Sequence, residues 1–294
     1  MAKNSLLTLI RNRVGQGHRD DYIPLVRLSR SNISKSAFQS TGPLPGYRRA
    51  FHLLTNGMRI VALLMLWLGA LDVRESFPLW PFDHPHPLAD WPYGKAVDLM
   101  CIGMSGVRYA LDEAAGKPRS RGSGLQAVDL MVTKGDRDRP GCLLIECAQT
   151  GQIEAGDRPL PTARRVKRSR QYALLNGMAH HVIDPNSLDE TFVANLDSLA
   201  DAPNTVRREV SEYDLSVIHE HLARYLDGDS ICGAVWHTAS ALGKNEQQVW
   251  NVFDALAWYQ KVDIDLATPV YRTEPMVTGG QQLKAHMRHL IFGD

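Results

Sequence analysis

The chain has 294 residues, of which 44% are hydrophobic, and this composition excludes disordered and fibrous proteins. Because 33 Lys and Arg residues nearly balance 32 Asp and Glu residues, the formal charge of +1 identifies no class of partner. The four cysteines follow no zinc or disulfide spacing and no signal peptide opens the sequence, so we expect a reduced, cytoplasmic protein. The longest uncharged apolar run, residues 60–71, is shorter than the roughly 20 residues that span a bilayer, so we expect no membrane segment.

Residues 1–50 form a basic segment. They hold nine Lys or Arg residues and only two Asp residues, a balance of +7 that leaves the remainder of the chain near −6. Turn-forming residues recur in GQGHRDDYIP (residues 15–24) and STGPLPG (residues 40–46), and no apolar periodicity persists. We expect an irregular basic N-terminal arm over residues 1–50, for which a poorly packed terminus is the simplest interpretation.

Residues 51–203 have the pattern of an α/β core. The segment HLLTNGMRIVALLMLWLGAL predicts a buried helix that begins at Thr55 or Asn56. The proline-rich residues 77–96 predict an extended loop or an edge strand. Two apolar runs, QAVDLMV (residues 126–132) and GCLLIECA (residues 141–148), flank the turn KGDRDRPG and predict a central hairpin. The segment TARRVKRSRQYALLNG predicts a basic helix, and AHHVID predicts a further strand.

Residues 204–294 predict a helical C-terminal domain, which follows the polar junction SLADAPNTVRRE. Helices are expected over residues 214–226, near ICGAVWHTASAL and over NEQQVWNVFDALAWYQ, with a break at Gly243. The segments VDIDL and PVYRT predict a two-stranded wing, so the region has the pattern of a winged helix. Thirteen acidic residues against eight Lys or Arg residues over residues 201–294 make a protein-docking winged helix at least as compatible with the sequence as a DNA reader.

Asp129 and Glu146 are the candidate chemical residues, one in each strand of the predicted hairpin. Such a hairpin brings paired positions to about 5 Å, and two carboxylates at that distance invite Mg²⁺ or Mn²⁺. A bound cation would polarise a phosphodiester and activate water, as in metal-dependent nucleases. An acidic residue in a strand is more commonly solvent-facing. However, Glu146 lies among apolar residues in LLIEC, where a carboxylate needs a partner or a metal.

Four segments in order over roughly residues 12–200 resemble the TnsA endonuclease subunit of heteromeric transposases. They are GQGHRDDYIP, HLLTNGMRIVALLMLWLGALDVRESFPLWP, AVDLMV with LLIECA, and KRSRQYALLNGMAHHVID. The resemblance implies a restriction-endonuclease-like core with a PD-D/ExK-type site and a C-terminal region that binds DNA and a transposition ATPase. It also implies that the protein cuts the 5′ ends of a transposon while a DDE transposase of the TnsB type cuts the 3′ ends.

The resemblance assigns some site residues and leaves two positions unmatched. Asp129 falls on the family's metal-binding Asp, and Glu146 falls on a position where TnsA has Gln and related nucleases have Asp or Glu. The carbonyl of Cys147 would be a backbone ligand. The family Lys falls on Ala148, which removes a cation that would orient water, and the family Glu of the first helix falls on Met58, which leaves a one-metal site.

The predicted basic helix carries the candidate DNA contacts. A run of charged residues is usually a solvated face, but this run flanks the proposed metal site, where phosphate contacts would position duplex DNA. Lys167 could replace the missing family Lys, although a solvated or phosphate-facing role is the commoner one for such a residue. The candidate DNA-binding residues are Arg164, Arg165, Lys167, Arg168 and Arg170.

The sequence leaves three functions open. The first is a Mg²⁺-dependent endonuclease that acts with a TnsB-type transposase and a TnsC-type AAA+ ATPase in the bacterial cytoplasm, at the nucleoid when in complex. The second is a catalytically impaired assembly factor that links transposase, ATPase and DNA, because Ala148 and Met58 leave the activity undecided. The third is a DNA-binding regulator that uses the winged helix, against which the acidic balance of the C-terminal region argues.

Overall fold

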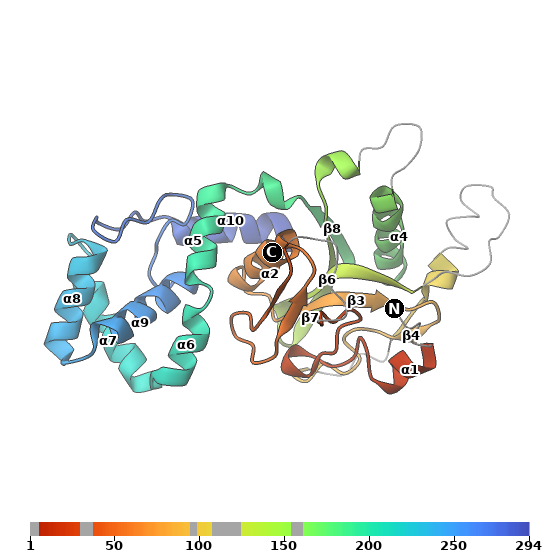
Figure 1. The fold of residues 1–294 in the computed structure, drawn as a ribbon, viewed down its shortest axis with the longest axis horizontal. Coiled ribbons are helices and arrows are strands. Elements are labelled where there is room, and N and C mark those ends of the chain that lie inside the picture. Colours follow the sequence, from red (N-terminus) through yellow and green to blue (C-terminus); the bar gives the residue numbers. More distant parts are fainter. Residues whose placement is uncertain (1–5, 30–37, 95–98, 108–124, 154–160, 294) are drawn as a thin grey trace. The chain divides into compact units, whose positions relative to one another are not determined.

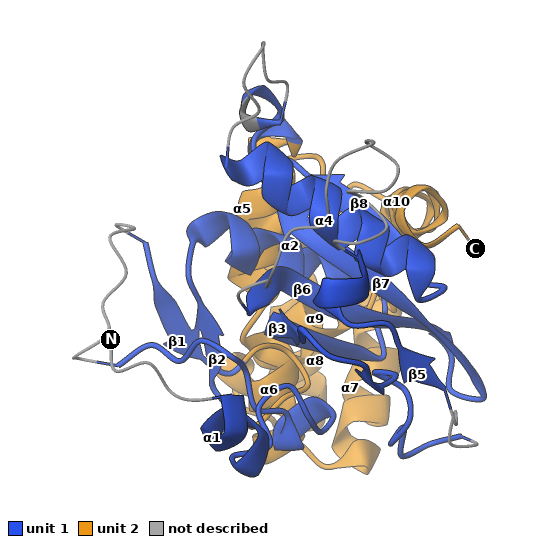
Figure 2. Ribbon diagram, turned by 90° about the vertical axis from the view of Figure 1, so that its right-hand side faces the viewer, with its two compact units in different colours: residues 1–43, 49–187 blue, residues 44–48, 188–294 orange. Residues whose placement is uncertain are grey.

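The computed structural model describes residues 6–29, 38–94, 99–107, 125–153 and 161–293 (Figure 1). Three of the nine basic residues counted over residues 1–50, Lys3, Arg30 and Lys35, lie outside these ranges. The chain divides into two compact units (Figure 2). The first comprises residues 1–43 and 49–187, so it takes in most of the expected arm, and the second comprises residues 44–48 and 188–294.

The first unit is built on a four-stranded mixed sheet, so the expected α/β class is confirmed. Its strands are β3 (Asp72–Leu79), β6 (Gln126–Asp136), β7 (Arg139–Cys147) and β8 (Ala179–Ile183), in the spatial order β3-β6-β7-β8. Strands β6 and β7 form the predicted antiparallel hairpin, and β3 pairs antiparallel with β6 at the sheet edge, where its proline is tolerated. Strand β8 runs parallel to β7.

Helices α2 and α4 pack on this sheet, and both follow the sequence prediction. Helix α2 (Asn56–Trp67) begins after Thr55, whose hydroxyl accepts a hydrogen bond from the amide of Met58 at 3.1 Å. It packs against β3, β6 and β7. Helix α4 (Pro161–Leu175) packs against β7 and β8 and forms the crossover between these parallel strands. The central strands β6 and β7 therefore carry Asp129 and Glu146, and α4, which carries the basic residues, packs next to them.

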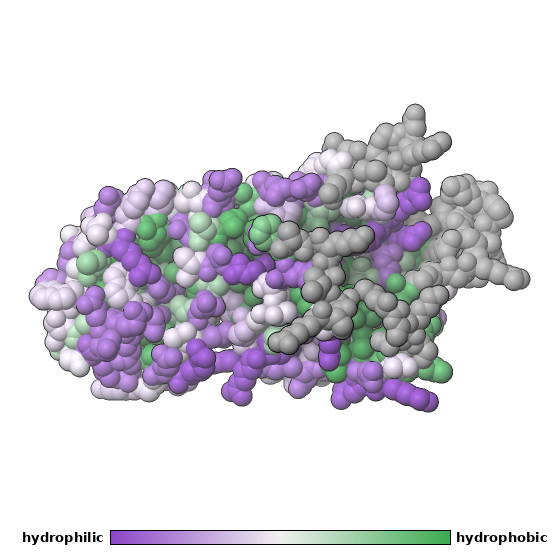
Figure 3. Space-filling model, viewed as in Figure 1, coloured by the Kyte–Doolittle hydropathy of each residue, from purple (hydrophilic) through white to green (hydrophobic). Residues whose placement is uncertain are grey.

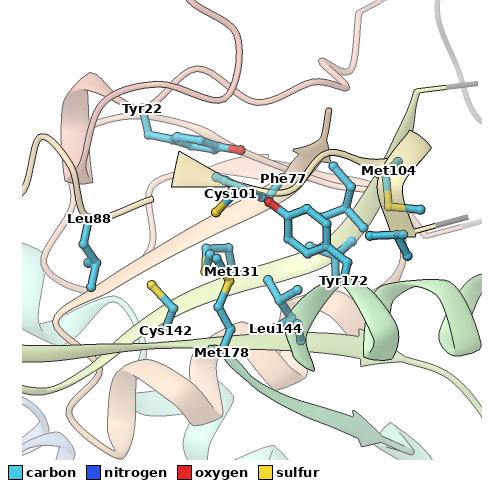
Figure 4. Close-up of a cluster of buried hydrophobic side chains, with 14 of the residues drawn as sticks. Tyr22, Phe77, Leu88, Cys101, Met104, Met131, Cys142, Leu144, Tyr172 and Met178 are labelled. Atoms are coloured by element: carbon cyan, nitrogen blue, oxygen red, sulfur yellow. The ribbon is translucent and has the colours of Figure 1, made fainter. Parts of the chain in front are cut away.

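The N-terminal segment is part of the core. Tyr22 is buried, and its hydroxyl donates a hydrogen bond to the carbonyl of Glu75 at 3.0 Å. Figure 4 shows Tyr22 in one cluster with Phe77 of β3, Leu144 of β7 and Tyr172 of α4. The expectation of a poorly packed terminus is therefore wrong for this segment, because an aromatic side chain anchors it to the sheet.

Short elements complete the first unit. They are α1 (Leu6–Arg11), the 3₁₀ turns Arg19–Asp21, Thr150–Gln152 and Pro185–Ser187, the paired strands β1 (Ser40–Gly42) and β2 (Phe51–Leu53), and the paired strands β4 (His84–Pro85) and β5 (Met100–Cys101). The pairing of β4 with β5 agrees with the predicted loop or edge-strand character of the proline-rich stretch.

The second unit is helical. Its helices are α5 (Glu190–Leu199), α6 (Ala202–Glu209), α7 (Glu212–Tyr225), α8 (Ile231–Leu242), α9 (Glu246–Trp258) and α10 (Gly280–Phe292). Helices α7, α8 and α9 match the three predicted helices, and α8 ends at Gly243, whose φ of 61° is accessible to glycine. The expected polar junction is instead helical, because Asp189 caps α5 and the proline of α6 lies in its first turn.

The expected wing does not form among the described residues of the second unit. Residues 262–266 and 269–273 are not paired as strands, and the bridge found near them joins Ser230 to Pro275. The side chains of Ile264 and Leu266 are buried, so the alternation in VDIDL reflects a packed loop. Helix α9 packs against α5, α6, α7 and α8 and buries seven of its side chains, mostly toward its C-terminal end.

Figure 3 shows one face of the helices of the second unit. On the face that Figure 3 shows, the residues over α7 and α8 are mostly hydrophilic, with small hydrophobic spots among them. Across the described residues, no helix has both the length and the apolar character that crossing a membrane requires.

Candidate active site

The two acidic candidates lie side by side at the centre of the sheet. Leu130 of β6 pairs with Ile145 of β7, so the next positions along the antiparallel register are Asp129 and Glu146. Because paired residues of neighbouring strands point to the same face, both carboxylates project from one face of the sheet. The predicted placement of the pair on adjacent strands is confirmed, and its role in binding metal stays a prediction.

Arg165 of α4 joins the two carboxylates. Its Nη1 lies 3.0 Å from Asp129 Oδ1 and its Nη2 lies 3.1 Å from Asp129 Oδ2, which is a bidentate pair. The same Nη2 lies 2.9 Å from Glu146 Oε2. One guanidinium therefore contacts three of the four carboxylate oxygens and shows that the carboxylates converge.

The position of Arg165 follows from the way α4 packs on the sheet. Ser169 and Tyr172 of α4 are fully buried, and residue 165 lies one turn before Ser169 on the same side of the helix. Burial alone would lower the pKa of Arg165, but Asp129 and Glu146 raise it. The guanidinium therefore stays charged and lies against the carboxylates, and its role as a DNA contact stays a prediction.

Of the two acids, Glu146 lies in the environment that disfavours its charged form more. Its side chain has no exposed area, and burial followed by the charge of Asp129 raises its pKa to about 8. The contact with Arg165 opposes this shift. That contact is an ion pair without hydrogen-bond geometry, so neither carboxylate oxygen of Glu146 accepts a hydrogen bond. A buried carboxylate in this state is short of cationic or hydrogen-bonding partners.

The backbone of Cys147 also contacts the site. Its amide donates a hydrogen bond to Asp129 Oδ2 at 2.8 Å and so fixes the orientation of that carboxylate. The contact found is made by the N–H, whereas the sequence resemblance implied a metal ligand at the carbonyl of the same residue. The role of the carbonyl stays a prediction.

The two positions where the resemblance implies a Lys and a Glu are apolar here. Ala148 is buried, and so is Met58 in the first turn of α2, which offers no ligand oxygen. Lys167 is exposed on α4 and lies two residues from Arg165, about 200° around the helix. Lys167 is therefore on a different side of α4 from the carboxylates and does not replace the family Lys.

The other basic candidates of α4 are exposed. Arg164, Lys167 and Arg168 follow the three- and four-residue spacing of one helix face. Arg170 is exposed as well and adds to burial in lowering the pKa of His180, which falls to about 4. A cationic surface therefore lies on the helix that also carries Arg165.

A second charged cluster joins two of the segments on which the resemblance rests. His18 Nδ1 lies 3.2 Å from Asp72 Oδ2, and the amide of Arg19 donates to Asp72 Oδ1 at 3.1 Å. Asp90 lies 3.0 Å from His18 Nε2 on the other side of the ring. The sequence did not predict that GQGHRDDYIP and LDVRESFPL contact each other. The available signal was the presence of charged residues in the otherwise apolar strand LDVRESFPL, because such residues need polar partners when they are buried.

The donor set of the candidate site fits a single divalent cation under one condition. Asp129 and Glu146 offer carboxylate oxygens, and the buried oxygens of Glu146 that accept no hydrogen bond are atoms that a cation would satisfy. Within the described residues, no group of three or more His, Cys, Asp or Glu side chains could hold a metal. The guanidinium of Arg165 lies among the same oxygens, so the fit requires that it withdraw.

Comparison with known proteins adds no further assignment: neither the protein-family models nor the curated proteins include a match to this chain.

Proposed function

We propose that this protein is a TnsA-like subunit of a heteromeric transposase and that it cuts the 5′ ends of a transposon. The proposal rests on the four sequence segments quoted above and on one geometric observation. Asp129 and Glu146 converge from the two inner strands of a mixed sheet, within 3.1 Å of a common guanidinium. Convergent carboxylates on neighbouring strands are the arrangement that a PD-D/ExK-type nuclease site requires.

In this proposal some residues bind the metal ion, and others position the carboxylate or the DNA. Asp129, Glu146 and the Cys147 carbonyl would hold Mg²⁺ or Mn²⁺, which supplies polarisation of the phosphodiester and activation of water. The Cys147 amide orients Asp129 through its 2.8 Å hydrogen bond. Exposed residues of α4, above all Arg164 and Arg168, contact backbone phosphates and set the DNA strand over the carboxylates.

The partners follow from the same resemblance. A TnsB-type DDE transposase would cut the 3′ ends, so that the two proteins together release the element by double-strand cuts. A TnsC-type AAA+ ATPase would dock on the C-terminal helices. The acidic balance of that region and the burial of α9 favour a protein partner over DNA there. These features also disfavour the winged-helix regulator.

A second candidate function is a transposase subunit that assembles the complex without cutting DNA. Three observations favour it: Ala148 and Met58 stand in apolar surroundings where the family has Lys and Glu, and Arg165 already neutralises the acidic pair. The two candidates share the fold and the partners, and they differ only in whether the second DNA strand is cut.

Sequencing of insertion products separates the two candidates. The wild type, with its transposase, ATPase and Mg²⁺, is expected to give simple insertions, whereas Asp129→Ala gives cointegrates because only the 5′ cut depends on this site. Asp136→Ala removes an exposed carboxylate from the same strand and serves as the matched control. Equal cointegrate fractions from the wild type and Asp129→Ala would reject the nuclease and support the assembly factor.

A further inference from the structure

Arg165 occupies the position that a divalent cation at the acidic pair would need. Its two terminal nitrogens lie 2.9–3.1 Å from three oxygens of Asp129 and Glu146. A cation held by the same oxygens would lie within a few ångströms of the guanidinium, and two positive charges at that distance repel each other strongly in a site shielded from water. Guanidinium and metal therefore exclude each other.

The side chain of Arg165 has a route away from the carboxylates. About one third of the side chain is exposed, so it lies at the edge of the site and not at its buried centre. The buried residues Val166 and Ser169 hold α4 on the sheet, so the side chain can turn outward without moving the helix. Arg164 and Arg168 are exposed on the same helix, which makes the adjoining surface cationic.

A phosphate group is the ligand that competes best for this side chain. A guanidinium binds phosphate through the same bidentate geometry that it uses with Asp129. DNA drawn to the exposed cations of α4 brings phosphates within reach of Arg165. An arginine guanidinium is protonated at neutral pH in either position.

We propose that Arg165 is an electrostatic lock, which keeps divalent cations out of the acidic pair until a DNA phosphate withdraws the guanidinium. This inference rests on the proposed function and adds its regulation. By linkage, DNA raises the affinity of the site for the cation, and the cation raises the affinity for DNA by the same factor. The device would confine cation binding, and therefore strand cutting, to the DNA-bound protein.

Mn²⁺ binding tests the lock without a transposase or a cleavage assay. Free Mn²⁺ is measured by electron paramagnetic resonance with the full-length wild type, with Arg165→Met, and with each after addition of a short DNA duplex. Without DNA, Arg165→Met should bind Mn²⁺ at least about 10-fold more tightly than the wild type, within the usual range of coupling between sites. The duplex should tighten binding by a similar factor in the wild type and leave Arg165→Met unchanged.

Two further variants control this measurement. Arg224→Met removes an arginine that forms an exposed ion pair with Glu220 in the second unit, and it should keep the wild-type affinity for Mn²⁺. Asp129→Asn lacks one carboxylate of the site and measures the Mn²⁺ that the duplex binds by itself. Equal Mn²⁺ affinity in the wild type and Arg165→Met, weaker binding in Arg165→Met, or no site-specific binding in either would overturn the lock.

The test remains decisive if Arg165→Met does not fold, since removal of the arginine leaves two carboxylates uncompensated. The wild type alone is then sufficient for the test. If the DNA duplex leaves the Mn²⁺ affinity of the wild type unchanged, the lock is excluded. Failure of the lock also differs from failure of the proposed function. Cleavage that depends on Asp129 without coupling of DNA to Mn²⁺ refutes only the lock, whereas coupling without any 5′ cut refutes only the nuclease.

Discussion

The buried ion pair between Arg49 and Glu75 provides a sharp test of what holds the first unit together. Arg49 donates to both carboxylate oxygens of Glu75 at 2.8 Å, and its remaining donors reach the carbonyls of Arg19 and Val73. The side chain of Glu75 has no exposed area, and that of Arg49 is 8% exposed. Water therefore screens this pair very little.

The substitution Arg49→Met keeps the length of the side chain and removes its charge. Glu75 would then stay buried, and among the described residues it would keep the amide of His52, at 3.1 Å, as its one hydrogen-bond partner. Loss of one member of a buried pair destabilises a protein by about 3–5 kcal/mol, because the other charge stays buried and uncompensated. With a urea m-value of about 2 kcal/mol/M, the unfolding midpoint should fall by about 2 M.

Urea unfolding followed by circular dichroism measures this effect. The double variant Arg49→Met with Glu75→Met should recover much of the loss, because replacing both partners with apolar residues removes the uncompensated charge. Arg224→Ala breaks an exposed ion pair on α7 and should change the free energy of unfolding by less than about 1 kcal/mol. A loss below about 1 kcal/mol for Arg49→Met would refute the reasoning, because it would show that Glu75 is solvated in the folded protein.

Two further predictions concern DNA binding and pH. Joint replacement of Arg164, Lys167 and Arg168 by Ala should weaken duplex binding in fluorescence anisotropy and flatten its salt dependence by up to about one unit of slope per lost contact. An unchanged slope of binding affinity against salt concentration would show that these three side chains are solvated and do not contact DNA. Burial opposes protonation of His18, but hydrogen bonds to Asp72 and Asp90 outweigh it and raise its pKa above 6.5. The stabilisation from His18 is therefore complete below pH 6.5 and lost as the pH rises through the raised pKa, so Tm should fall over that range in the wild type and not in His18→Asn. Parallel Tm profiles for the two proteins would contradict this assignment.

The sequence predicted the parts of the fold that local signals specify. Thr55 caps α2 because a hydroxyl at that position satisfies a free amide of the first turn. The β6–β7 hairpin followed from two apolar runs around a polar turn, and the same register brought Asp129 next to Glu146. Both predictions depend on interactions between residues that are close in the sequence.

The predictions that failed depend on tertiary packing. The VDIDL segment alternates like a strand, but Ile264 and Leu266 are buried in a loop that no second strand accompanies. Tyr22 anchors a segment whose composition is typical of a loose terminus, because its partners lie about 50 residues away. The sequence prediction also missed the contact of Arg165 with the acidic pair, while its assignment to DNA stays a prediction. Its place one turn before the buried Ser169 was the available signal that it faces inward.

The topology of the acidic pair also bears on how the protein folds. The β6–β7 hairpin closes a turn of a few residues, so its contacts are local and form early. Folding of the hairpin alone brings two carboxylates together without a counter-charge, which is a local conflict in the energy landscape. The counter-charge comes with α4, in the crossover that leads to β8. We therefore expect the β6–β7 hairpin to become stable only when α4 packs on the sheet. Arg165 would then couple formation of the hairpin to pairing of the parallel strand β8.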